Sequence, residues 1–67
     1  MIKNYIVVKT TDENFVGAKF EVNLVHLLMS MQVQINDQKF YLSEIIVKSN
    51  LIILKSGIYE IEIQEVL

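Results

Sequence analysis

The chain has 67 residues, a net charge of −2 from six lysines and eight acidic residues, and an apolar fraction of 52%. It has no cysteine and one histidine, which excludes the disulfides and the structural zinc site that usually support so small a domain. It also has no arginine, so nucleic-acid binding is disfavoured, because arginine makes the bidentate contacts to phosphate and guanine.

The first part of the chain predicts a β-hairpin. Residues 2–9 carry apolar side chains on both faces, as in a strand that is largely buried on both sides. A polar turn over residues 10–14 follows. Over residues 16–24 every second residue is apolar and the residues between are glycine or polar, which indicates a half-exposed strand that pairs with the first.

Residues 24–31 fit two periodicities. In a helix, Leu24, Leu27, Leu28 and Met31 fall at i, i+3, i+4 and i+7, and Asn23 is placed to cap the first turn. In a strand, the apolar residues would alternate with polar ones up to position 35, interrupted only by Leu28. We favour the helix, because the strand would run for about 20 residues without a turn signal.

Two short strands are predicted over residues 33–42. The turn between them falls at Asn36-Asp37 or at Asp37-Gln38. Pairing Val33 with Phe40 or with Leu42 keeps the apolar face intact in both cases, so the sequence leaves both registers open.

Residues 45–63 predict a three-stranded antiparallel meander on which the rest of the chain packs. A seven-residue unit occurs twice here, at residues 45–51 and at residues 52–58. Asn50 and Gly57 occupy matching places and readily adopt the positive φ of a tight hairpin turn. We therefore expect a turn at each, with Ser56-Gly57 as the loop of the second hairpin.

These segments predict one mainly β domain over residues 1–67. We expect a small antiparallel sheet of five to six strands, bent or closed into a partial barrel of SH3 or OB size, with one short helix near residues 24–31. Residues 2–9 and 59–66 are the expected edge strands, open to pairing because proline is absent. No apolar run approaches the about 20 residues of a membrane span, and no signal peptide is recognisable, so we expect a cytoplasmic protein without membrane contact.

Few residues offer chemistry. His26 lies four residues before Ser30, but a helix face supplies neither an oxyanion hole nor a nucleophile elbow, so a structural histidine is the favoured interpretation. Glu60 and Glu62 share a strand face at a separation that carboxylate-pair hydrolases use, yet such a pair is also the ordinary solvated face of a sheet. We therefore predict no catalytic residue, no cofactor and no metal ion, and a protein that is not an enzyme.

The apolar residues indicate a partner instead. Their share exceeds what a monomer of this size readily buries, so an interface is expected. A flexible apolar patch on the predicted helix is the kind of surface that adapts to a partner protein, although the same residues also suit core packing. The candidate partner-binding residues are Leu24, Leu27, Leu28, Met29 and Met31.

The favoured function is a non-enzymatic protein-binding module that forms a homo-oligomer and derives from a bacterium or its phage. Two other functions stay open. One is a small-ligand-binding oligomer, for a nucleotide or a metabolite, with a pocket lined by tyrosines, Lys48 or Lys55, and Ser49 or Ser56. The other is a nucleic-acid-binding β-barrel with stacking aromatic residues, which the lack of interleaved basic residues disfavours.

Overall fold

The computed structural model describes residues 2–11 and 13–67, so part of the expected turn over residues 10–14 lies outside the described residues. The described residues form seven strands, one short 3-10 helix and one α-helix. In chain order they are β1 (Ile2–Thr10), η1 (Glu13–Phe15), β2 (Lys19–Asn23), α1 (Leu24–Ser30), β3 (Gln32–Ile35), β4 (Gln38–Tyr41), β5 (Glu44–Val47), β6 (Leu51–Ser56) and β7 (Tyr59–Glu65).

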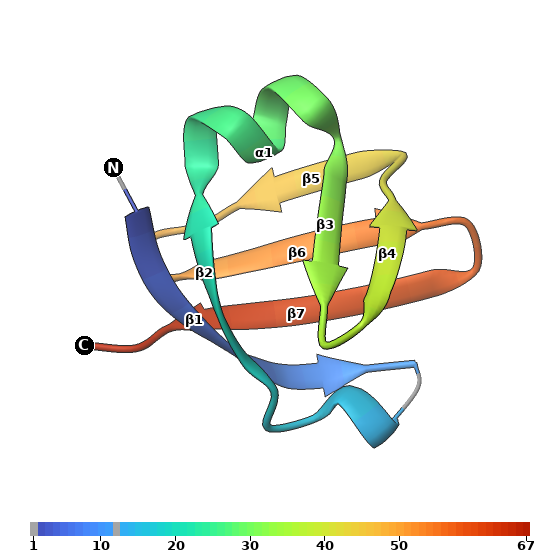
Figure 1. Ribbon diagram of the computed structural model, residues 1–67, viewed down its shortest axis with the longest axis horizontal. Helices are drawn as coiled ribbons and strands as arrows, with labels where there is room; N and C mark the ends of the chain where they lie inside the picture. Colours follow the sequence, from blue (N-terminus) through green and yellow to red (C-terminus); the bar gives the residue numbers. More distant parts are fainter. Residues whose placement is uncertain (1, 12) are drawn as a thin grey trace.

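The strands of the described residues form two antiparallel sheets, a five-stranded one in the order β2-β1-β7-β6-β5 and the two-stranded β3-β4. In Figure 1, β5, β6 and β7 form a back layer, β2 and the β3–β4 hairpin cross in front of them, and α1 runs along the top. β1 joins the layers, because it pairs with β2 on one side and β7 on the other, and a register shift between Val7 and Lys9 bends it. The mainly β fold with one short helix is thus confirmed.

The back layer is the predicted meander, and it forms the floor of the core. Ile52 and Leu54 of β6 and Ile61 and Ile63 of β7 are each at most 1% exposed. They occupy alternate positions of paired strands, so all four side chains point to the same face. The other buried apolar residues are Tyr5, Val7, Phe15, Val22, Leu27, Val33, Ile35, Phe40 and Leu42.

The two turns of the meander differ from the prediction in detail. Gly57 has the expected positive φ of 60°, but the loop consists of Gly57 and Ile58, because Ser56 pairs with Tyr59. Asn50 has no positive φ, so that prediction was wrong. Its carbonyl accepts a hydrogen bond from the N–H of Glu65 at 2.9 Å, which extends the β6–β7 pairing by one residue pair.

The helical interpretation of residues 24–31 is correct. The side chain of Asn23 accepts a hydrogen bond from the His26 N–H at 3.2 Å and caps α1, and Met31 ends the helix with a φ of 53°. None of the helices in the described residues is long and apolar enough to cross a membrane. The following hairpin turns at Asn36 and Asp37, and Val33 pairs with Phe40, which decides the register.

The predicted edge strands were wrong. β1 and β7, the first and last strands, pair with each other and lie inside the five-stranded sheet, whose edges are β2 and β5. Tyr5 pairs with Glu65, a contact between opposite ends of the chain that no local pattern indicates. The open edges are therefore those of β2 and β5, together with those of the β3–β4 hairpin.

Candidate functional site

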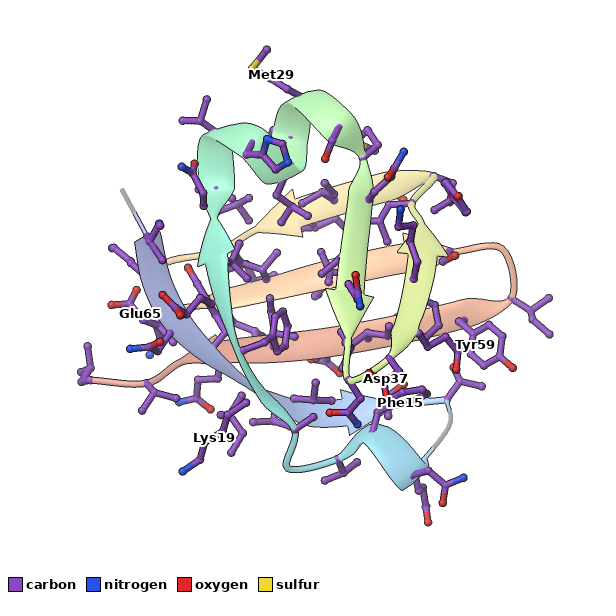
Figure 2. The ribbon with its side chains drawn as sticks, in the orientation of Figure 1. Phe15, Lys19, Met29, Asp37, Tyr59 and Glu65 are labelled. Carbon is purple, nitrogen blue, oxygen red and sulfur yellow. The ribbon has the colours of Figure 1, made fainter. Side chains whose placement is uncertain are left out.

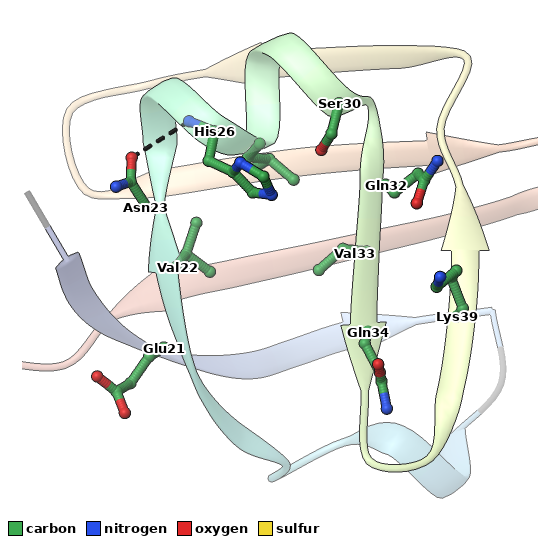
Figure 3. Close-up of a pocket in the computed structure, with 10 residues that line it drawn as sticks. Glu21, Val22, Asn23, His26, Ser30, Gln32, Val33, Gln34 and Lys39 are labelled. Atoms are coloured by element: carbon green, nitrogen blue, oxygen red, sulfur yellow. Dashed lines mark hydrogen bonds between the residues drawn. The ribbon is translucent and has the colours of Figure 1, made fainter.

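A cleft opens in the front layer between β2 and β3. These strands follow each other in the chain, but they do not pair, because α1 stands between them and separates their ends. The resulting β2–β3 cleft has a volume of about 350 Å³ and is lined from β2, α1 and β3, with Lys39 of β4 at its far side (Figure 3).

The floor of the cleft is apolar and belongs to the core. Val22 of β2, Leu27 of α1 and Val33 of β3 are 6%, 3% and 8% exposed, respectively. Each packs in the core cluster, which holds it in place. An occupant of the cleft would therefore meet a preformed apolar surface.

The rim of the cleft is polar. In strands successive side chains point to opposite faces, so the neighbours of Val22 and Val33 turn outward. These exposed neighbours are Glu21 and Asn23 on β2, and Gln32 and Gln34 on β3. Lys39 lies beyond β3 and places a positive charge on the side opposite Glu21 (Figure 3). An apolar floor with a polar rim suits an occupant with one apolar and one polar face.

Ser30 brings a buried polar atom to the cleft. Its Oγ is shielded from solvent and has no hydrogen-bond partner in the structure. Ser30 lies on α1 and lines the cleft together with His26, one turn earlier. Because no hydrogen bond links the Oγ to His26, the two do not form a nucleophile–base pair. The hydroxyl is instead a buried donor whose partner is missing, which costs stability.

The main chain of both strands also faces the cleft. Along an antiparallel strand, successive N–H and C=O groups point alternately toward and away from the partner strand. Leu42 donates to the carbonyl of Met31, so Met31 and Val33 face β4, while Gln32 and Gln34 direct their main-chain groups to the cleft.

The same alternation applies to β2. Val7 of β1 donates to the carbonyl of Ala18 just before the strand, so Ala18, like Val22, directs its main chain to β1. Glu21 directly precedes Val22 and therefore directs its N–H and C=O the other way, away from β1 and toward the open edge. The cleft thus lies between two sheet edges.

The predicted partner-binding residues fall into two groups in the structure. Leu27 lies in the core, and Leu24 and Met31 are partly buried against it. Leu28 and Met29 are 47% and 81% exposed, and Met29 points away from the molecule at the top of Figure 2. Sequence reasoning missed Val25, which is 65% exposed on the same face.

These three exposed residues form the α1 apolar face, defined here as Val25, Leu28 and Met29. They stand at i, i+3 and i+4, the spacing of one helix face, so the sequence did contain the signal. It was masked because the opposite face, with Leu24, Leu27 and Met31, shows the same spacing.

The other sequence candidates have ordinary structural roles. Glu62 contacts Lys9 at 3.9 Å, and the main chain of Glu60 is hydrogen-bonded to Thr11. The four residues line a second hollow of about 330 Å³, where their polar groups interact with one another. Within the described residues, no group of three histidine, cysteine or acidic side chains could hold a metal ion.

The residues of the expected small-ligand pocket do not meet in either hollow. Lys55 pairs with Glu44 at 3.6 Å, and the hydroxyl of Ser56 donates to the carbonyl of Tyr41 at 2.7 Å. Phe40 packs edge to face with Phe15 and with Tyr59, at centroid distances of 5.5 Å and 6.1 Å. These aromatic rings serve the packing of the protein itself.

Comparison with known proteins leaves the site to be interpreted from its own geometry. No protein-family model matches the chain, and no curated protein or solved structure matches it at a significant level.

Proposed function

We propose that this protein is a non-enzymatic protein-binding module whose partner docks on the α1 apolar face. The observation that carries the proposal is the exposure of three neighbouring apolar side chains, Val25 at 65%, Leu28 at 47% and Met29 at 81%. A single exposed apolar residue is normal on a protein surface, but a cluster is typical of an interaction site. Methionine and leucine side chains also adapt readily to the shape of a partner.

Other exposed apolar residues are spread along the chain, with Ile2 and Val8 on β1, Val16 before β2, and Val66 and Leu67 after β7. Ile58 is 89% exposed at the tip of the β6–β7 loop, and Tyr41 and Val47 are 66% and 49% exposed on strands. They come from three separate elements, whereas the α1 apolar face places three side chains within five successive residues. The helix is therefore the best supported docking element.

The remaining parts of the proposal depend on composition. A chain with one histidine and no cysteine has few means for catalysis, which supports a binding function. The lack of cysteine also suits a reducing compartment, so we place the protein in the cytoplasm of a bacterium, encoded by it or by its phage. Self-association through the α1 apolar face is part of the proposal, since it would cover apolar area that the fold leaves exposed.

The test compares charge substitutions on the α1 apolar face and at an exposed apolar site outside it. Purified wild-type protein, the double variant Leu28→Glu/Met29→Glu and the control Ile58→Glu serve as bait, and their self-association is followed by light scattering over a dilution series. We expect the double variant to lose both a copurifying partner and any oligomer, because buried charges oppose docking. The Ile58→Glu control should keep them.

Equal recovery of the partner by all three proteins would contradict the proposal. A mass of 7.8 kDa at every concentration would remove self-association while leaving the partner unaffected. Stabilisation of the protein by a nucleotide or metabolite, without any protein partner, would favour the small-ligand alternative. Binding that weakens steeply with salt would favour the nucleic-acid alternative.

A further inference from the structure

We propose that the β2–β3 cleft is a strand-insertion site, which takes an extended peptide segment of the partner protein as an additional strand between β2 and β3. This inference deepens the proposed function and rests on it for the nature of the partner. The inserted strand would join the five-stranded and the two-stranded sheets into one continuous sheet. Such β-augmentation is an established mode by which proteins recognise extended peptides.

The length of α1 is compatible with a gap one strand wide. The helix has seven residues and, at a rise of 1.5 Å per residue, is about 10 Å long. It runs from the end of β2 to the start of β3 across the top of the gap (Figure 1). Neighbouring strands lie about 4.8 Å apart, so two spacings, with one strand between, also amount to about 10 Å.

The main-chain groups beside the cleft suit an inserted strand. Glu21 directs its N–H and C=O to the cleft from β2, and Gln32 and Gln34 do so from β3. β2 and β3 run in opposite directions in Figure 1, so an inserted strand would be antiparallel to one and parallel to the other, as in mixed sheets. A peptide of four to five residues would match the lengths of β3 and β2.

The side chains around the cleft define the chemistry of the peptide. Residues that point inward would rest on the apolar floor of Val22, Leu27 and Val33, while alternate residues would point outward between Glu21 and Lys39. The peptide is therefore expected to alternate apolar and polar residues. Ser30 lines the cleft beside this floor, with its Oγ shielded from solvent and unpartnered.

The probe is a random library of displayed seven-residue peptides, selected on the immobilised wild-type protein, with the best binder then synthesised as a free peptide. Its dissociation constant is measured for a series in which one peptide N–H after another is methylated. Successive N–H groups of a strand point to opposite sides, so an inserted strand uses all of them. We expect methylation at each of at least three successive central positions to weaken binding about tenfold or more.

Two proline variants locate the binding site on the protein. Gln34→Pro removes a main-chain N–H that faces the cleft and leaves the β3–β4 hydrogen bonds in place. Val47→Pro is the matched control on the open edge of β5, because Lys48 donates to Leu51 and the N–H of Val47 points away from β6. We expect Gln34→Pro to weaken peptide binding about tenfold and Val47→Pro to leave it unchanged.

Several results would overturn the strand-insertion proposal. The first is a library without binders, which is the result expected if a small molecule or a second copy of the chain fills the cleft. The second is weaker binding on methylation of every second N–H only, which would indicate that the peptide pairs with one edge. The third is an equal effect of the two proline variants on peptide binding. The methylation series uses only the wild-type protein, so it tests the strand-insertion proposal even if Gln34→Pro does not fold. If Leu28→Glu/Met29→Glu loses the partner protein but no peptide binds the wild type, the strand-insertion proposal is wrong and the proposed function stands.

Discussion

The back and front layers of this molecule use the same kinds of residues for different purposes. In the back layer, β5, β6 and β7 follow one another in the chain, pair directly, and contribute four side chains that are at most 1% exposed. In the front layer, β2 and β3 are also consecutive strands, but α1 holds them apart. In the back layer β6 and β7 are thus paired on both sides, whereas the facing edges of β2 and β3 in the front layer are unpaired.

Under the proposed function, this difference would separate stability from binding within one small domain. A core in a chain of this size supplies only about 3–5 kcal/mol, so few residues can be withheld from packing. The α1 apolar face withholds apolar residues in the front layer, next to the β2–β3 cleft, whose floor residues stay in the core. Substitutions in the back layer are thus expected to act on folding, and substitutions in the front layer mainly on binding.

The largest expected effect is that of Ile61→Ala in the back layer. Ile61 is fully buried, and truncation of such a side chain removes apolar contacts and leaves a cavity, at a cost of about 2–5 kcal/mol. That loss is comparable to the whole stability of the domain, so we expect a largely unfolded protein in urea titration monitored by circular dichroism. Ile58→Ala, at an 89% exposed position, is the control and should change stability little.

Gly57→Val tests the turn of the back layer and should cost less. The φ of Gly57 is 60°, and no atom lies within 4 Å of the position a Cβ would take, so the cost is backbone strain alone. A β-branched residue there should destabilise the protein by about 1–2 kcal/mol, measured as the shift of the urea midpoint. Ile58→Val is the control, because Ile58 in the same loop has no positive φ. Equal losses for both variants would contradict the strain explanation.

Asn23→Ala tests whether α1 responds to a local change separately from the back layer. The side chain of Asn23 accepts the hydrogen bond from the His26 N–H, and loss of such a cap costs about 1 kcal/mol. We expect faster hydrogen exchange in α1 and unchanged exchange in β6 and β7. Asn23→Asp keeps the acceptor and should behave as the wild type. Uniform loss of protection in all elements would show that the two layers do not respond separately.

Ser30→Ala is expected to have the smallest effect, and with the opposite sign. The buried Oγ of Ser30 lacks a hydrogen-bond partner, and alanine favours the helix, so the variant should be more stable than the wild type by about 0.5–1 kcal/mol. Thermal and urea unfolding measure the change, with Ser49→Ala in the exposed β5–β6 loop as the control. A destabilised Ser30→Ala protein would show that the hydroxyl has a role within the folded chain itself.

Local patterns predicted several elements of this fold correctly. The spacing of Leu24, Leu27, Leu28 and Met31 identified α1, because residues three and four apart share a helix face. Asn23 was recognised as its cap for the same local reason. The meander and the positive φ of Gly57 were also predicted, since adjacent strands and tight turns depend on residues that are close in sequence.

The seven-residue repeat shows the limit of such local reasoning. It placed Asn50 and Gly57 in equivalent turns, but one loop contains Asn50 without a positive φ and the other begins at Gly57. The two loops differ in length, with three residues between β5 and β6 and two between β6 and β7, which the repeat did not indicate.

By itself the sequence determined the mainly β class, the single helix with its cap, and the apolar residues of α1, because each depends on neighbours along the chain. Only the tertiary structure decided that β1 and β7 pair, and hence that β2 and β5 are the edges. It also decided that Val22, Val33 and Ser30 meet around one cleft. Pairing between the chain ends depends on which surfaces remain after the meander and hairpins have formed, and no local pattern carries that information.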